Sequence, residues 1–212
     1  DMKAEIREIA GLKGGDTIFF IADKEKQAAL YAGQLRNELG QRLDLLEKNA
    51  YRFCFINDFP MYEYDEEQKK IIFTHNPFSM PQGGLEALTT KDPLELLAYQ
   101  YDIVCNGVEL SSGAVRNHNL DIMVKAFEIA GYTEEDLKEK FGALYNAFQY
   151  GAPPHAGMAP GVDRMIMLLR NEENIREVIP FPMNGNAQDV MCGAPNEVSE
   201  MQLREVHIKV RK

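Results

Sequence analysis

The sequence predicts an α+β fold in which helices flank an antiparallel sheet. Three observations indicate it: apolar segments typical of strands, amphipathic segments with helix caps, and no regular strand–helix–strand alternation. The 212 residues are enough for one large domain, or for one domain and a piece of another. The shares of hydrophobic residues (45%) and charged residues (26%) are ordinary for a globular protein.

Charge and cysteine content argue against a general polyanion-binding surface and against a site built on paired cysteines. The net charge of −10 argues against a general polyanion-binding surface. Cys54, Cys105 and Cys192 are far apart and form no CxxC pair, so we expect reduced, packed thiols in a cytoplasmic protein. We find no signal peptide and no membrane-spanning run. The chain opens within a helical pattern without Met, so we expect a piece of a longer protein.

Residues 1–50 form a first unit, too small for a full domain. A helix is predicted over residues 2–10, ending at Gly11, followed by a short strand over 17–22. Asp23 is expected to cap a long helix. An apolar stripe along that helix is made of Leu30, Leu35, Leu39, Leu43 and Leu46.

From Tyr51 the pattern becomes strand-like, over residues 51–65 and 69–81, with an acidic turn between them. Asp92 and Pro93 are typical of the N-cap and first position of a short helix, predicted over 93–100.

The C-terminal half is mainly helical by its pattern. We expect a helix over 120–130 that Gly131 ends, and a second helix that Thr133 caps, with Asp136 at the capping-box position. Its apolar face is made of Leu137, Phe141, Leu144 and Phe148. A Gly/Pro-rich stretch with a short strand, a helix over 162–170, and a tail of loops and short strands complete the chain.

The dipeptide Asn106-Gly107 is the strongest hairpin signal in the sequence. A two-residue turn there pairs Val104 with Glu109 and Asp102 with Ser111. Asp102 and Glu109 then share a face as diagonal neighbours. We therefore expect their carboxylates to converge.

Two such carboxylates on an apolar strand pair would repel each other unless a cation lies between them. Mg²⁺ takes one or two protein carboxylates and completes its shell with water and phosphate oxygens, so the hairpin is a candidate Mg²⁺-nucleotide platform at Asp102 and Glu109. The alternative is structural: Asp102 in water at a strand end, and Glu109 paired with a surface lysine.

Arg116 lies seven residues after Glu109, so a regular strand would turn it to the opposite face. A bulge at Gly113 would restore the face and offer the guanidinium fork to a carboxylate in the same pocket. In the alternative interpretation Arg116 only forms an ion pair with Glu109.

In residues 155–170 a strand enters a Gly/Pro turn and then a helix. Gly157 and Gly161 would let the backbone approach a flat or anionic ligand. Arg164 lies in the first helical turn, where its charge opposes the helix dipole, which suggests a phosphate partner. Strings of this kind are also common in ordinary strand–turn–helix packing.

Taken together, "NGVELSSGAVR", "YGAPPHAGMAPGVDRMIMLL" and "NIREVIPFP" resemble the C-terminal half of a bacterial-type aspartyl-tRNA synthetase, a class II enzyme. "GMAPGVDR" resembles class II motif 3. The resemblance covers essentially the whole chain. It implies that residues 1–48 are the end of the bacterial insertion domain, and that residues 49–212 are the C-terminal half of the catalytic domain.

The resemblance also implies roles for individual residues. Glu109 engages ATP through Mg²⁺, with Asp102 as its metal-binding companion. Arg116 grips the side-chain carboxylate of L-aspartate, and His75 lies near the substrate's amino group, where relatives often have a second His in place of Asn76. The residues that hold ATP are Gly161, Val162, Asp163 and Arg164, of which Arg164 reaches the phosphates and is the catalytic candidate.

Motif 1, motif 2 and the anticodon-binding domain are absent from the sequence. The resemblance therefore implies part of a ligase that makes aspartyl-adenylate from L-aspartate and ATP and charges tRNA(Asp), with a homodimeric parent. We expect the 212 residues alone to be inactive. The alternative is a synthetase-like module that binds an amino acid or a nucleotide without catalysis. The sequence leaves open whether tRNA(Asn) is also charged.

Overall fold

The computed structural model describes residues 1–211, which divide into two compact units: Asp1–Ala50, and the residues from Tyr51 onward. The first unit contains α1 (Met2–Ile9) and α2 (Glu25–Arg42). None of its residues is buried. Helix α1 ends before Gly11, as predicted.

Two other predictions for the first unit are wrong. Residues 17–22 form no strand, because no other strand lies in this unit to pair with their backbone groups. Asp23 does not cap α2: its carboxylate accepts from Lys24 N at 2.7 Å, and Lys24 is the uncapped N-cap residue. Because α2 ends at Arg42, Leu43 and Leu46 lie beyond the helix.

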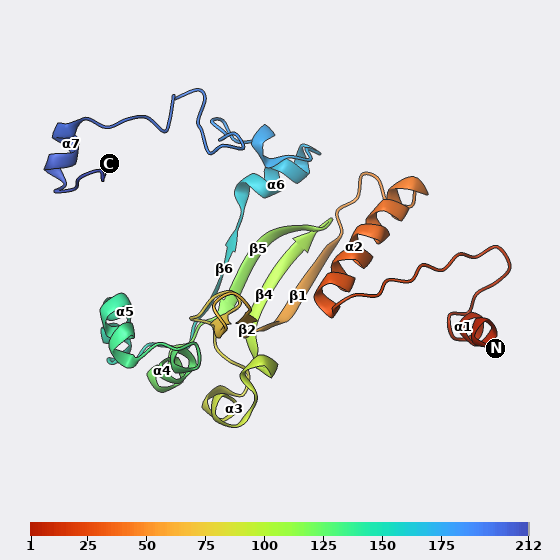
Figure 1. Ribbon diagram of the computed structural model, residues 1–212, viewed down its shortest axis with the longest axis horizontal. Helices are drawn as coiled ribbons and strands as arrows, with labels where there is room; N and C mark the ends of the chain where they lie inside the picture. The colour runs from red at the N-terminus through yellow and green to blue at the C-terminus, as the bar shows by residue number, and fades with distance from the viewer. Residues whose placement is uncertain (212) are drawn as a thin grey trace. The chain divides into compact units, whose positions relative to one another are not determined.

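The second unit is built on an antiparallel sheet with helices, which confirms the predicted α+β class (Figure 1). Its strand order is β1-β4-β5-β6. The strands are β1 (Phe53–Pro60), β4 (Leu97–Cys105), β5 (Val108–Val115) and β6 (Ala156–Pro160). A separate hairpin pairs β2 (Tyr62–Asp65) with β3 (Lys70–Phe73).

Strand β4 begins where a helix was expected. Asp92 caps the turn as predicted, accepting from Leu94 N at 2.9 Å, but the 3₁₀ helix η1 covers only Pro93–Glu95. From Leu97 to Gln100 exposed and buried residues alternate, which is the two-residue period of a strand. Helix α3 (Gly84–Thr90) was not predicted.

The β4–β5 hairpin turns at Asn106-Gly107, as predicted, and pairs Val104 with Glu109. Beyond that pair the register shifts, so that Asp102 lies opposite Ser112 rather than Ser111. The bulge is therefore at Leu110, not at Gly113.

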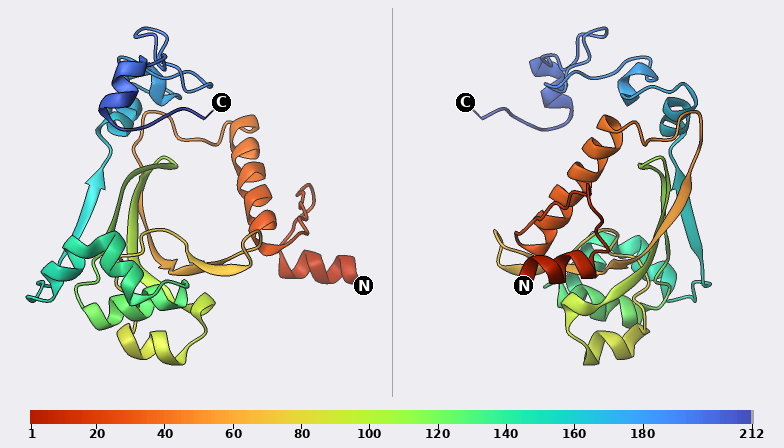
Figure 2. Two further views of the ribbon diagram at one scale, coloured as in Figure 1. Left: turned by 60° about the vertical axis from the view of Figure 1, so that its left-hand side comes forward. Right: turned by 90° about the vertical axis from the view of Figure 1, so that its right-hand side faces the viewer.

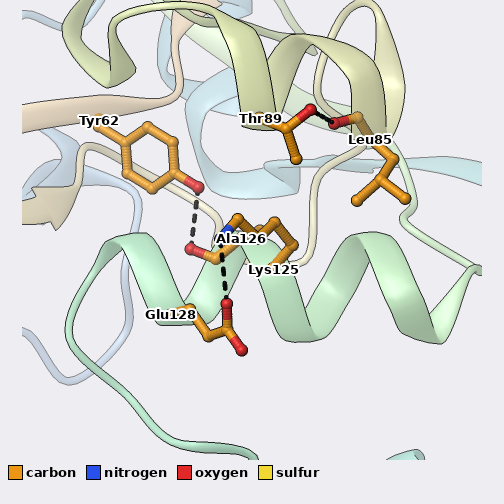
Figure 3. Close-up of polar contacts among 6 residues, drawn as sticks. All are labelled: Tyr62, Leu85, Thr89, Lys125, Ala126 and Glu128. Carbon is orange, nitrogen blue, oxygen red and sulfur yellow. Dashed lines mark hydrogen bonds and ion pairs between the residues drawn. The ribbon is translucent and has the colours of Figure 1, made fainter.

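Helices α4 (Leu120–Ile129) and α5 (Glu134–Phe148) pack on each other and, with α3, lie at the opposite end of the sheet from α6 (Figures 1 and 2). Thr133 and Asp136 form the predicted capping box. The core lies between these helices and the β2–β3 hairpin, and Tyr62 is buried within it. Its hydroxyl donates to Ala126 O at 2.9 Å (Figure 3), and burial raises the pKa of that phenol.

After α6 (Val162–Leu169) come η2 (Ile175–Glu177) and α7 (Glu200–Glu205). The described residues after β6 form no strand, so the predicted short strands of the tail are wrong. Within residues 1–211 no helix combines the length and the apolar character that crossing a membrane requires.

Candidate functional site

Asp102 and Glu109 lie on the same face of the β4–β5 hairpin. Glu109 is opposite Val104, and Asp102 is two residues before Val104 on the same strand. Burial, and then the charge of Glu109, raise the pKa of the Asp102 carboxyl above its ordinary value. The two carboxylates are thus close enough to repel each other, which is the arrangement that the hairpin predicted.

The bulge at Leu110 also decides the face of Arg116. Since Ser112 is opposite Asp102 and Ala114 is opposite Gln100, alternation along β5 brings Arg116 to the face of Asp102 and Glu109. The extra residue, Leu110, thus turns Arg116 to this face, which is the effect that was predicted for a bulge at Gly113. The bulge lies three residues earlier in the chain than predicted. The described residues include no ion pair between Arg116 and Glu109, so that alternative interpretation is wrong.

Arg164 is the cation that pairs with Glu109. From the first turn of α6, its Nη1 lies 3.1 Å from Glu109 Oε1 and donates to Glu109 O at 2.6 Å. A cation at this end of a helix opposes the dipole, and the carboxylate offsets that cost. Glu109 is therefore held by an arginine 55 residues away, rather than by a surface lysine.

His75 reaches the same cluster from the loop between β3 and α3. Its ring is exposed and packs edge-on against Phe59, with 5.0 Å between the ring centroids. The charge of His75, like that of Arg164, lowers the pKa of Asp102 and so opposes the larger upward shift. His75 is therefore within electrostatic reach of Asp102.

The loop after His75 is tied to both strands of the hairpin. Met80 N donates to Val115 O at 2.8 Å, and Tyr99 N donates to Met80 O at 2.9 Å. These bonds fix the loop beside the cluster. Sequence reasoning missed this anchoring, because no local pattern indicates which strand a loop will contact.

The remaining motif residues lie where α6 begins. Gly161 is the N-cap and donates its N–H to Leu110 O at 2.7 Å, while Val162 and Asp163 are exposed in the first turn. No neighbouring atom requires glycine at Gly157, where an added Cβ would meet nothing within 4 Å.

The close backbone approach occurs at Gly113 instead. A Cβ there would overlap Gly157 O and the ring of Tyr101, which covers the glycine and donates its hydroxyl to Gly157 O at 3.0 Å. Gly113 therefore serves the packing of β4, β5 and β6 rather than a bulge.

The donor set is not a complete metal centre. Within residues 1–211, no group of three or more His, Cys, Asp or Glu side chains could hold a metal ion. The carboxylates of Asp102 and Glu109 offer two oxygen-donor groups, as Mg²⁺ uses when phosphate oxygens and water complete its shell. All three cysteines are free.

Comparisons with known proteins identify the family of the chain. The family model of class II tRNA synthetases (D, K and N) matches residues 3–185. An aspartate–tRNA(Asp/Asn) ligase of Zymomonas mobilis is 64% identical over 200 residues, which are 94% of this chain and 34% of that protein. An aspartate–tRNA ligase of Streptomyces avermitilis is 58% identical over 209 residues, which are 99% of this chain and 36% of that protein.

Among solved structures, an aspartyl-tRNA synthetase from Entamoeba histolytica aligns over 88% of this chain and 32% of that chain, with 22% identity and a TM-score of 0.48. The chain thus spans about a third of the length of the curated relatives that it matches. The family assignment rests on the sequence matches: the chain belongs to the class II tRNA synthetases of the D, K and N group.

Proposed function

We propose that the whole protein is an aspartate–tRNA ligase, which joins L-aspartate to ATP as aspartyl-adenylate and transfers the aspartyl group to tRNA(Asp). The observation that carries the proposal is the cluster around Asp102: Glu109, Arg164 and His75 all act electrostatically on its carboxyl, and Arg164 also pairs with Glu109. The names of relatives about 60% identical support aspartate as the amino acid.

In this reaction a carboxylate oxygen of aspartate attacks the α-phosphorus of ATP, the bond to pyrophosphate breaks, and pyrophosphate leaves. Negative charge builds on the phosphoryl oxygens. Arg164 would stabilise that charge, a role that its guanidinium supports by being held by Glu109 and about half exposed. No protein nucleophile is needed.

Arg116 is proposed to bind the side-chain carboxylate of aspartate through its fork, and His75 to contact the amino group. Arg116 follows β5 on the face that carries Asp102, and His75 is within electrostatic reach of Asp102. Gly161, Val162 and Asp163 are proposed to line the ATP site with Arg164. Val162 and Asp163 are exposed in the first turn of α6, where backbone N–H groups have no partner within the helix, whereas the N–H of Gly161 is bonded to Leu110 O.

Asp102 and Glu109 would hold Mg²⁺, which neutralises phosphate charge when it is bound. Burial, and then the charge of Glu109, raise the pKa of Asp102, and a cation would relieve both the burial of the charge and the repulsion between the two carboxylates. Glu109 would then be shared between Arg164 and the ion.

The proposal extends to the organisation of the protein. Residues 1–48 would be the end of an insertion domain and residues 49–212 the C-terminal half of the catalytic domain, which the division into compact units after Ala50 supports. We propose a cytoplasmic homodimer. The 212 residues alone are proposed to be inactive, because the matched relatives are about three times as long.

The test is ATP–pyrophosphate exchange by the whole protein with Mg²⁺. Exchange should depend on L-aspartate, should be far weaker with L-asparagine, and should stop with EDTA. Equal exchange with L-lysine or L-asparagine would refute the substrate. Nucleotide binding without exchange would favour a binding module. Charging of tRNA(Asp) and tRNA(Asn) transcripts then decides the tRNA range.

A further inference from the structure

The face of the sheet opposite Asp102 and Glu109 is apolar. On β1 it carries Phe53 and Phe55, which lie opposite Cys105 and Ile103 of β4. On β6 it carries Met158, opposite Gly113. Together with α6, this face encloses an open groove of about 430 Å³ that no charged residue lines.

The groove is incompletely covered. Phe53 is 65% exposed, Phe55 68%, Met158 46% and Leu169 of α6 70%. A contiguous apolar surface of this kind on a folded protein marks a site of association, because leaving it in water forgoes the free energy of burial.

A second observation at the groove concerns a polar atom. Ser111 lines it and is only 4% exposed, and its hydroxyl has no hydrogen-bond partner among the described residues. Buried hydroxyls are nearly always paired, so the surface that covers the groove should bring a donor or acceptor to Ser111.

Strand β1 adds to the same surface. It is an outermost strand of the sheet, and nearly all of its residues are exposed. A long apolar edge strand is usually protected by another segment, since its free backbone groups invite pairing. The open edge and the apolar groove meet at Phe53, which belongs to β1 and lines the groove.

We infer that in the whole protein this apolar face is covered by the part of the same polypeptide that lies outside these 212 residues, as an amphipathic segment with a polar group facing Ser111. About two thirds of the length of the matched relatives is not represented here, which is ample to cover one sheet face. The inference does not depend on the proposed substrate.

Neighbouring positions on β1 provide the test. In the whole protein, Phe55→Cys in a Cys54→Ser background reports on the apolar face. Native Cys54, which pairs with Val104 on the other face, is the matched control. Maleimide labelling is followed by peptide mass spectrometry, in native buffer and in denaturant.

Cysteine at position 55 should react with maleimide about a hundredfold more slowly in native buffer than in denaturant. Cys54 should react in native buffer at a rate within about tenfold of its rate in denaturant. A benzophenone attached at position 55 should crosslink to a peptide from outside the 212 residues of the same molecule. Labelling at position 55 as fast as at Cys54 would overturn the inference. So would crosslinks between copies, or protection that disappears on dilution.

Because Phe55→Cys could weaken folding, unmodified protein gives a second measurement. Met158 should resist peroxide in the native whole protein and should be oxidised in the isolated 212-residue chain, where it is half exposed. Equal oxidation of Met158 in both would contradict the covering segment.

Discussion

Replacing Arg164 with alanine tests the proposed chemistry most directly. The guanidinium touches Glu109 at two atoms, at 2.6 and 3.1 Å, and about half of each side chain is exposed. Loss of an exposed ion pair of this kind lowers the free energy of unfolding by about 1 kcal/mol or less. The variant should therefore remain folded.

The effect on the reaction should be much larger. Removing one fixed donor from developing negative charge raises the barrier by about 2.7–4 kcal/mol, a loss of about 10²–10³ in kcat. The assay is ATP–pyrophosphate exchange by the whole protein, with thermal unfolding measured in parallel. Arg164→Lys keeps the charge without the fork and should fall between Arg164→Ala and the parent.

Arg170→Ala is the matched control, since Arg170 is an exposed arginine at the other end of α6. It should change the free energy of unfolding by no more than about 0.5 kcal/mol, as surface substitutions usually do, and it should leave kcat near that of the parent because Arg170 is not part of the cluster. Exchange by Arg164→Ala within about tenfold of the parent, about 1.4 kcal/mol of barrier, would refute the role assigned to Arg164.

Three further predictions concern the sheet. Arg116→Ala should lower kcat/KM for aspartate by orders of magnitude while the KM for ATP changes little, because a carboxylate loses its charged fork; unchanged aspartate kinetics would remove Arg116 from the pocket. Because the pKa of Asp102 is raised in the folded protein, its charge lowers the free energy of unfolding at pH values above that pKa, and this penalty is gone once the pH is below 3.8. Asp102→Asn should therefore raise the free energy of unfolding at pH 7 but not at pH 3, and urea unfolding at the two pH values measures the difference. Gly113→Ala should cost about 1–3 kcal/mol by overlap with Tyr101, whereas Gly157→Ala, facing open space, should cost about 1 kcal/mol or less; equal midpoints in urea would contradict the packing argument.

Elements with local chemistry were predictable from the sequence. The capping box of Thr133 and Asp136 joins residues three apart, and the Asn106-Gly107 turn joins adjacent strands. Such interactions form between near neighbours, so composition and spacing suffice to predict them. The same holds for Asp102 and Glu109, whose common face follows from the turn.

The sequence did not suffice to predict secondary structure that depends on pairing with residues far away in the chain. Residues 17–22 have the composition of a strand but no neighbour to pair with, whereas residues 97–100, expected in a helix, pair with β1 and β5. Intrinsic preference is worth a fraction of a kcal/mol per residue, and tertiary hydrogen bonds and burial outweigh it.

For the candidate site, the sequence by itself determined the residue types: two acids, two arginines and a histidine suited to a charged nucleotide and a dicarboxylate. Only the tertiary structure decided that Arg164 pairs with Glu109, that the bulge lies at Leu110, and that His75 is in reach of Asp102. These groups are up to 89 residues apart along the chain, counting from His75 to Arg164. Contacts over such separations depend on strand register and on the start of α6, which are set by the packing of the whole sheet rather than by any local run of residues.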